Sequence, residues 1–225
     1  SVNSRIYVDN TILRGYNEYP LKIENSSANI LNNEILYNGG GEYSGQLYIR
    51  LDNNSSPHSR KIVFENNFFN TNRSVGYVQN YDDGDKPDSI IFSNNIFKGI
   101  NELGSLNSYT TNQNYTLFER NLFTSENKNG YLLNLNNDKS SIFRNNLFKN
   151  IYTVFDMYQP ITSTIENNIF YDITTVFYAT SDLSLSIIQN NIFYKYSNLF
   201  SSNADLNNFP IGFGEVLTVN TNGDS

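Results

Sequence analysis

One six-residue pattern recurs along the chain and constrains its fold more than any other feature. An apolar residue is followed by two polar residues, an asparagine and two apolar residues. The six clear copies are "FENNFF" (64–69), "FSNNIF" (92–97), "FERNLF" (118–123), "FRNNLF" (143–148), "IENNIF" (165–170) and "IQNNIF" (188–193). Self-similarity of this kind is typical of proteins built from stacked structural repeats.

The fourth residue of the pattern, an asparagine, is taken as position 0 of each repeat. The clear copies place it at Asn67, Asn95, Asn121, Asn146, Asn168 and Asn191, and weaker copies place it at Asn33 and Asn10. The successive spacings are 23, 34, 28, 26, 25, 22 and 23 residues. A minimum near 22 with a variable surplus indicates a fixed unit with loops of changing length.

Each unit is predicted to consist of short β-strands, because its residues are β-branched, aromatic or polar and lack helical periodicity. One strand precedes the asparagine, as in "KIVFEN" (61–66), and a short strand holds the apolar pair after it. A further strand, here called the downstream strand, follows at 47–52, 76–82, 131–136, 153–158 and 175–180. Coils of this length, stacked about 4.8 Å apart, predict a parallel β-helix.

The asparagine and the aromatic residues have physical roles in such a coil. Asparagine tolerates the left-handed backbone of a turn, and an inward amide can donate to one neighbouring coil and accept from the other. The sequence therefore predicts an asparagine ladder inside the core. A phenylalanine stack is expected at position +2, formed by Phe69, Phe97, Phe123, Phe148, Phe170 and Phe193.

These motifs resemble the right-handed parallel β-helix repeat of pectate-lyase-like proteins, over about 1–200. The resemblance implies a single-stranded, all-β, right-handed parallel β-helix of about eight coils. It also implies a function that involves polysaccharides, on which many members of the family act. Phage tailspikes, adhesins and structural surface proteins share the fold, so the fold does not fix the function. Residues 201–225 leave the repeat and are predicted to form a C-terminal cap or tail.

Charge and cysteine content exclude several classes of partner. The net charge is −7 with no visible basic stripe, which argues against binding to nucleic acid. No apolar run approaches 18 residues, so no membrane span is predicted. The absence of cysteine excludes disulfides and fits a secreted or cell-surface protein of bacterial or phage origin.

Two apolar rows have an ambiguous direction. Position −4 holds Val63, Ile91, Leu117, Ile142, Thr164 and Ile187, and position +1 holds Phe68, Ile96, Leu122, Leu147, Ile169 and Ile192. Strict alternation turns both rows outward, as surfaces for a partner or for self-assembly. The alternative is that the asparagine corner breaks the alternation and places one row inside. Position −2, with Glu65, Glu119, Arg144 and Glu166, is expected to face solvent.

The outer side of the downstream strands is the predicted glycan-binding face. Amides, carboxylates and tyrosines on a rigid sheet suit sugar hydroxyls and sugar faces. One predicted row runs from coil to coil through Arg50, Gln79, Asn107, Asn134, Asp156 and Tyr178. The row beside it holds Asp52, Tyr81, Tyr109, Asn136, Tyr158 and Thr180. An ordinary polar outer sheet is the alternative interpretation.

Loops at 51–61, 81–89 and 109–115 follow the downstream strands and are expected to wall a cleft. Asp82, Asp83, Asp85 and Asp88 are candidate calcium ligands, since hard oxygen ligands at short spacing suit that ion. Arg50, Asp82 and Asp83 are the catalytic candidates for a polysaccharide lyase or a glycoside hydrolase. Asp82 and Asp83 are similar to the paired aspartates of polygalacturonases, but the glycine-flanked histidine of that family has no match in this sequence. The one histidine, His58, lies in a loop rich in serine, proline and asparagine.

Three hypotheses about function follow. The first is an extracellular module that binds a polysaccharide or glycan along the downstream strands. The second is a polysaccharide lyase or glycoside hydrolase, or a fragment of one. The third is a structural or adhesive module that forms homo-oligomers or stacks end to end.

Overall fold

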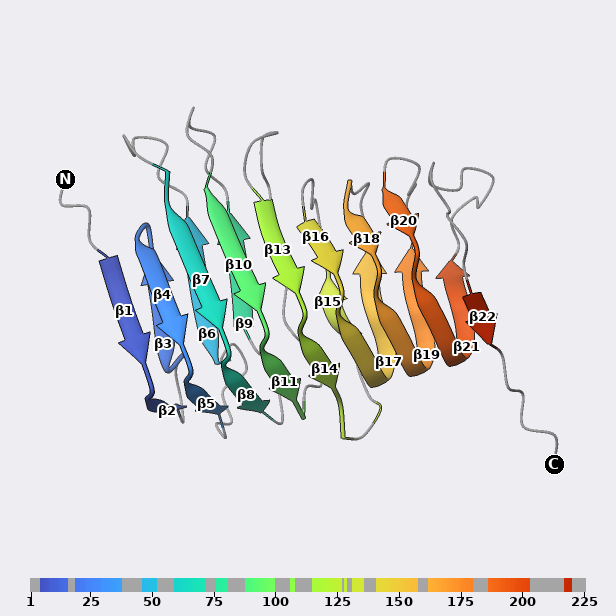
Figure 1. Ribbon diagram of the computed structural model, residues 1–225, viewed down its shortest axis with the longest axis horizontal. Coiled ribbons are helices and arrows are strands. Elements are labelled where there is room, and N and C mark those ends of the chain that lie inside the picture. Colours follow the sequence, from blue (N-terminus) through green and yellow to red (C-terminus); the bar gives the residue numbers. More distant parts are fainter. Residues whose placement is uncertain are drawn as a thin grey trace.

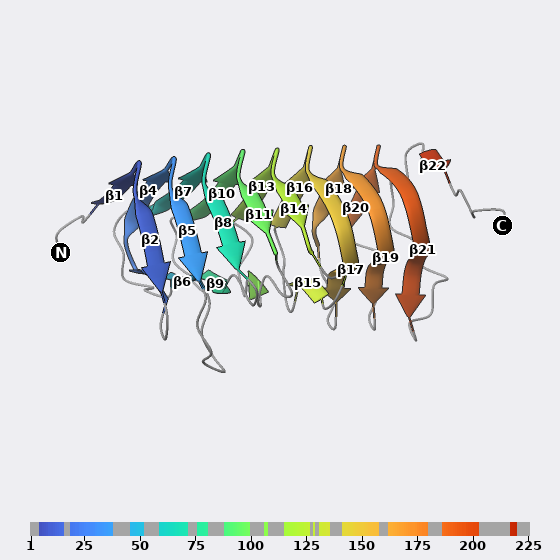
Figure 2. The same ribbon diagram turned by 90° about the horizontal axis from the view of Figure 1, so that it is seen from below.

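The chain winds into a right-handed parallel β-helix whose strands form three sheets (Figure 1, Figure 2), as predicted. The computed structural model describes residues 5–15, 19–37, 46–51, 59–71, 76–80, 88–99, 106–107, 115–126, 128, 131–135, 141–157, 162–179, 186–202 and 217–219. Every strand pair in these sheets is parallel, and a coil pairs with the coil that follows it. The all-β prediction is therefore confirmed.

The first sheet has eight strands and is formed by the strands that precede the asparagines. Its strands are β1 (Arg5–Asp9), β4 (Ser27–Leu31), β7 (Lys61–Glu65), β10 (Ser89–Ser93), β13 (Tyr115–Glu119), β16 (Ser141–Arg144), β18 (Thr164–Glu166) and β20 (Ile187–Gln189). They lie in register along the whole helix, so equivalent repeat positions form straight rows.

The second sheet is formed by the short strands that follow the asparagines. Its strands are β2 (Ile12–Gly15), β5 (Glu34–Tyr37), β8 (Phe68–Thr71), β11 (Ile96–Lys98), β14 (Leu122–Thr124), β17 (Leu147–Met157), β19 (Ile169–Ala179), β21 (Ile192–Ser202) and β22 (Leu217–Val219). The C-terminal strand β22 pairs with the start of β21, so part of the segment predicted as a cap or tail extends this sheet.

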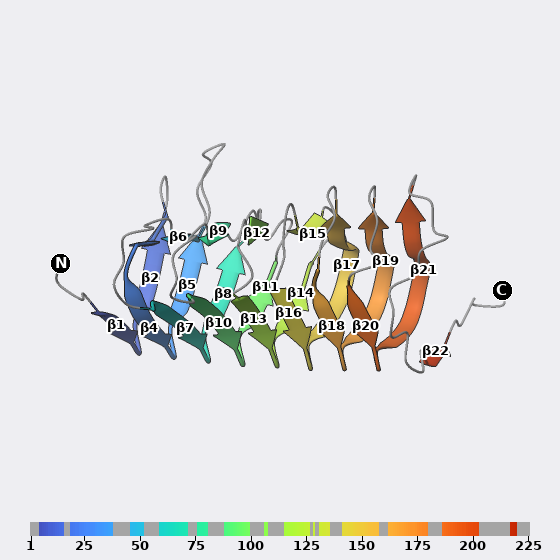
Figure 3. The ribbon, with the colours of Figure 1, turned by 90° about the horizontal axis from the view of Figure 1, so that it is seen from above.

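The third sheet contains the early downstream strands β3 (Leu21–Glu24), β6 (Leu47–Leu51), β9 (Gly76–Asn80) and β12 (Leu106–Asn107). In the later coils the downstream strand is continuous with the short strand, which gives the 11-residue strands β17, β19 and β21; β15 (Tyr131–Asn134) pairs with β17. Figure 3 shows the sheets from above, the side opposite to the view of Figure 2.

The asparagine ladder is confirmed and runs in one direction. From Asn67 to Asn191, each ladder amide oxygen accepts two hydrogen bonds from the preceding coil: Asn95 Oδ1 accepts from the backbone N of Asn67 at 2.9 Å and from its Nδ2 at 3.0 Å. The same Nδ2 also donates to a carbonyl of the coil before, as Asn67 does to Ile30 at 2.8 Å. Because the interior ladder members all make these bonds, the buried amides satisfy one another.

At each corner, the left-handed backbone and the buried amide belong to two adjacent residues, whereas the sequence analysis assigned both to one asparagine. The residue at position −1 has a left-handed backbone, with φ between 50° and 57°, at Asn10, Asn32, Asn66, Asn94, Arg120, Asn145, Asn167 and Asn190. The buried ladder residue comes next. The assignment of Asn10 to the ladder was therefore wrong by one residue. Thr11 occupies that place, and its backbone N donates to Asn33 Oδ1 at 2.9 Å.

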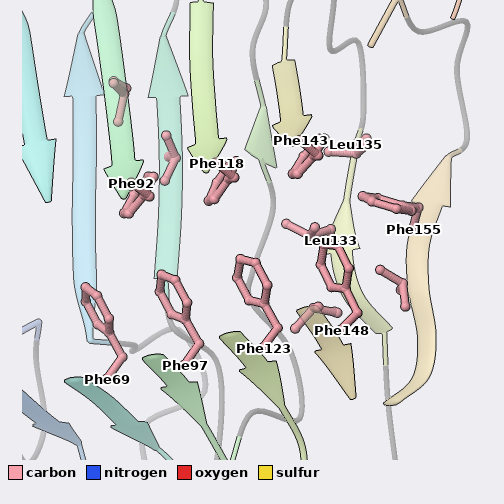
Figure 4. Close-up of a cluster of buried hydrophobic side chains, with 14 of the residues drawn as sticks. Phe69, Phe92, Phe97, Phe118, Phe123, Leu133, Leu135, Phe143, Phe148 and Phe155 are labelled. Atoms are coloured by element: carbon pink, nitrogen blue, oxygen red, sulfur yellow. The ribbon is translucent and has the colours of Figure 1, made fainter. Parts of the chain in front are cut away.

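Phenylalanine rings fill the core in rows along the helix axis (Figure 4). The predicted stack at position +2 is confirmed, with ring centroids of successive coils 4.5–5.0 Å apart from Phe69 to Phe193. A second stack runs through Phe64, Phe92, Phe118 and Phe143 at 4.7–5.0 Å. Since these rings are fully buried, they contribute a large share of the hydrophobic stabilisation.

Both ambiguous apolar rows face outward, because the extra left-handed residue at the corner restores the alternation on each side of it. Phe64, Asn67 and Phe69 are buried, whereas Val63 and Phe68 are half-buried. Other members range from Leu117, the most enclosed at 9% exposure, to Ile96 at 41%, Ile169 at 42%, Ile187 at 42% and Ile192 at 39%. The alternative of an inward row is therefore wrong.

Candidate functional site

The residues of the predicted row along the downstream strands are paired in two separate segments, one in the early coils and one in the late coils. Arg50 pairs with Gln79 and Gln79 with Asn107 in the third sheet. Asn134 pairs with Asp156 and Asp156 with Tyr178 in the later coils. Glu24, which pairs with Arg50, extends the row toward the N-terminus and was missed by the sequence analysis.

The early part of this row combines an aromatic ring with charged groups on the outer side of the sheet. Lys22 forms an ion pair with Glu24 at 3.2 Å, and its Nζ lies 5.3 Å from the centre of the Tyr48 ring. Tyr19 packs against Tyr48 with ring centroids 5.4 Å apart. Arg50 lies two residues after Tyr48 on β6, and its side chain is exposed. These five residues, Tyr19, Lys22, Glu24, Tyr48 and Arg50, are called the early-coil face.

The early-coil face follows from the clean alternation of β3 and β6. Leu21, Ile23 and Ile49 point into the core, which leaves the residues between them on the outer side. The repeat that contains Lys22 and Glu24 is one of the weak copies, so its downstream strand escaped attention in the sequence. The alternating segment "LKIE" at 21–24 is the signal that identifies it.

The late part of the row is different, and here the prediction that Asp156 lies on the outward surface is wrong. Asp156 is only 3% exposed, and Asn134 and Tyr178 are half-buried. Val154 and Val176, which alternate in step with Asp156 and Tyr178 along their strands, are fully buried and belong to the core cluster. Since both sides of these strands are buried, the Asp156 carboxylate is not displayed on the surface for a ligand.

Many candidate residues lie outside the described part of the chain. They are Asp52, Tyr81, Tyr109, Asn136, Tyr158 and Thr180 of the second predicted row, together with His58, Asp82, Asp83 and Asp85 of the loops. The catalytic role of Asp82 and Asp83 therefore stays a prediction, and so does the cleft between the loops. Of the catalytic candidates, the structure describes Arg50 alone.

Asp88, a candidate calcium ligand, is buried in an ion pair with Arg60. Its Oδ1 accepts from the backbone N of Arg60 at 2.6 Å, and its Oδ2 accepts from Nε of Arg60 at 2.9 Å. Arg60 Nη1 also donates to Asn25 Oδ1 at 2.7 Å, which links a third coil. The described geometry thus gives Asp88 a structural partner, and the described residues contain no group of three or more metal-ligating side chains.

A second charged cluster lies where β19 bends, at Asp172. Lys128 Nζ donates to its Oδ1 at 2.7 Å, and Lys195 Nζ donates to its Oδ2 at 3.1 Å. These bonds, the one from Lys128 most of all, lower the pKa of Asp172, and the Asp172 carboxylate in turn raises the pKa of Lys195. The cluster joins neighbouring coils on the outside of the helix.

No family model, curated protein or solved structure matches the chain. The structure confirms the parallel β-helix that the resemblance to pectate-lyase-like proteins implies, and no match supports the family itself. Within the described residues, no helix has the length and apolar character needed to cross a membrane.

Proposed function

We propose that the protein is a carbohydrate-interacting β-helix that binds a polysaccharide or glycan on its early-coil face. The proposal extends to a location outside the cell, secreted or at the cell surface. The observation that carries it is the group formed by the half-buried Tyr48 with the exposed Lys22 and Arg50, on paired strands whose inner residues Leu21, Ile23 and Ile49 are buried in the core.

The chemistry of the early-coil face suits a sugar chain. The tyrosine ring offers an apolar surface to a pyranose ring, while the ammonium, guanidinium and carboxylate groups offer hydrogen bonds to hydroxyls. Adjacent strands lie about 4.8 Å apart, so the groups form a regular array that a repeating polymer can follow. Two cations against one carboxylate favour a glycan that carries carboxylate groups.

The test is affinity electrophoresis of the chain in gels that contain neutral or uronate polysaccharides, supported by a glycan array. We expect retention that falls at least tenfold in Tyr48→Ala and in Arg50→Ala. Tyr152→Ala is the matched control, since Tyr152 is 46% exposed on β17, away from the early-coil face. If no polysaccharide retains the chain, the proposal is wrong. If Tyr152→Ala lowers retention as much as Tyr48→Ala does, the binding site is not the early-coil face.

The same polysaccharides distinguish binding from turnover. The chain is incubated with each polymer, and new reducing ends and the absorbance of unsaturated products are measured. A binding module leaves both signals at the level of the blank. Product formation that is lost in Asp82→Asn or Arg50→Ala would instead support a hydrolase or a lyase.

A further inference from the structure

Two apolar ridges run along the outside of the helix, one on each side of the asparagine corner. The first-sheet ridge consists of Val63, Ile91, Leu117, Ile142 and Ile187, interrupted by Thr164. The second-sheet ridge consists of Phe68, Ile96, Leu122, Leu147, Ile169 and Ile192. Single apolar residues on a surface are ordinary, but the second-sheet ridge has six half-buried or exposed ones on consecutive paired strands, a line about 24 Å long. The first-sheet ridge is flatter, because Leu117 is only 9% exposed. Apolar surface of this kind marks an interaction site.

The charges beside the two ridges have opposite signs. Position −2, next to the first-sheet ridge, carries Glu65, Glu119 and Glu166, with Arg144 as the one cation. Beside the second-sheet ridge lie the exposed Lys98 and Lys149 at position +3 and the exposed Lys195 at position +4, with Asp172 as the acidic residue at the equivalent place of the preceding coil. Two like faces would oppose charges of the same sign, whereas one face of each kind brings opposite charges together.

Contacts within the chain leave the three lysines largely exposed, whereas Glu119 is already paired and Glu166 accepts a hydrogen bond from Gln189. Lys149 contacts no carboxylate among the described residues and lies over the Tyr171 ring at 5.7 Å. Lys98 and Lys195 form ion pairs with Glu126 and Asp172, but their side chains stay 47% and 55% exposed. Glu119 forms ion pairs with Arg144 at 3.0 Å and with Arg120 at 3.4 Å, and its side chain is 17% exposed, so a neighbouring copy would compete with these contacts.

We infer that the occupant of these ridges is a second copy of the chain, with the first-sheet ridge of one copy against the second-sheet ridge of the next. A second copy has the same spacing between coils, so its ridge matches at every strand. A shift of one coil places Glu65 opposite Lys98 and Glu119 opposite Lys149, both lysines at position +3. Glu166 falls opposite the coil of Lys195, which lies one residue further along, at position +4, and is paired with Asp172 of its own chain.

The consequence of using two different faces is open-ended growth. When the first-sheet ridge of a copy is in contact with one neighbour, its second-sheet ridge is still exposed and can contact another neighbour. The contact is therefore heterologous, and rows of helices side by side result. The third sheet takes no part in the contact. The early-coil face therefore remains accessible, and the inference neither needs nor excludes binding of a glycan.

The test combines two charge reversals and measures association by sedimentation velocity from micromolar to millimolar concentration. We expect the wild-type chain to associate, and Glu65→Lys or Lys98→Glu alone to weaken association at least tenfold. An equimolar mixture of the two variants restores one contact and forms mixed dimers, since the lysine placed at position 65 in one variant meets the glutamate placed at position 98 in the other. Lys22→Glu is the control with the same charge change on the third sheet, and it associates like the wild type.

Other outcomes overturn the inference. A wild-type chain that stays monomeric at millimolar concentration shows that the ridges do not pair. Association that survives both reversals shows that the contact lies elsewhere, and a mixture that behaves like the separate variants contradicts the proposed register. Thermal unfolding of each variant confirms the fold, because both substituted side chains lie on the outer surface. Ile169→Ser supplies a second test that leaves the charges unchanged, with weaker association expected.

Discussion

The downstream strands of the early and late coils occupy equivalent places in the helix but bury their residues differently. In β6 the pattern alternates, with Leu47, Ile49 and Leu51 buried and Arg50 exposed. In β17 the five residues from Thr153 to Met157 are all buried. One repeat unit therefore supports two surfaces: a polar outer face in the early coils and an enclosed strand in the late ones.

The difference shows that the inward rows can build a coil whatever the downstream strand does. The ladder runs from Asn33 to Asn191, and the row at position +2 is aliphatic at Leu13 and Ile35 and aromatic from Phe69 to Phe193. The downstream strand can then vary without loss of register. Candidate binding residues are consequently to be sought where this strand is exposed, as in the early-coil face.

The largest expected effect comes from the buried ion pair of the early coils. Asp88→Ala leaves the Arg60 guanidinium buried without its carboxylate, and we expect a loss of about 3–5 kcal/mol in the free energy of unfolding. Lys22→Ala, which breaks the exposed pair with Glu24, should cost under about 1 kcal/mol. Chemical denaturation measures both. Equal effects would mean that the Arg60–Asp88 pair is not structural.

A pair of substitutions at equivalent places tests the contrast between the regions directly. Val154→Ala removes two buried methyl groups and leaves a cavity, so we expect a loss of about 2–3 kcal/mol. Tyr48→Ala, on the half-buried outer side of β6, should cost under about 1 kcal/mol. If the two losses are the same by urea denaturation, the late strands are no more enclosed than the early ones.

The acid stability of the late coils depends on Asp172. Its pKa is lowered in the folded chain, so its contribution is complete above the ordinary aspartate value of about 3.9 and is lost as the pH falls through the lower folded value. Asp172→Asn should therefore destabilise the chain by under about 1 kcal/mol at neutral pH, with an effect that shrinks as the pH falls below that value. Unfolding curves at neutral and strongly acidic pH measure the difference; a constant difference would contradict this origin.

The smallest expected effect lies at the junction of the two regions. Arg120 is the one residue other than asparagine at position −1 of the described coils, with φ of 56°. Asparagine adopts this backbone more readily, so Arg120→Asn should stabilise the chain by about 0.5 kcal/mol. The contact of Arg120 with Glu119 is exposed and its loss offsets little. A lower midpoint of thermal unfolding would show that this contact outweighs the backbone preference.

The sequence sufficed for the core because the rows there depend on residue type alone. Asn67 and Phe69 have equivalents at a constant offset in six repeats, and a buried row tolerates few replacements. The weak first copy was misaligned because Thr11 replaces the ladder amide. Alignment on Val8 and Leu13, which pack against the core, gives the register that the structure shows.

The surface of the downstream strands was predicted less well because its burial depends on what lies over it. Strict alternation held for β6 and failed for β17, where Val154 and Phe155 are adjacent and both buried. The adjacent apolar pairs in "YLLN" (131–134), "TVFD" (153–156) and "TVFY" (175–178) were a signal for burial on both sides. No such local signal reports the position of the long loops.

The one-way asparagine ladder also bears on how such a chain changes length during evolution. Each ladder residue forms its ladder bonds only with the coil before it and the coil after it. A unit of about 22 residues therefore contains every donor and acceptor that an inserted coil needs to continue the ladder. Duplication of one interior unit would lengthen the helix by a coil and leave every other contact in place. The same duplication at Thr11 would interrupt the ladder, because threonine has no side-chain amide to pass the bonds on.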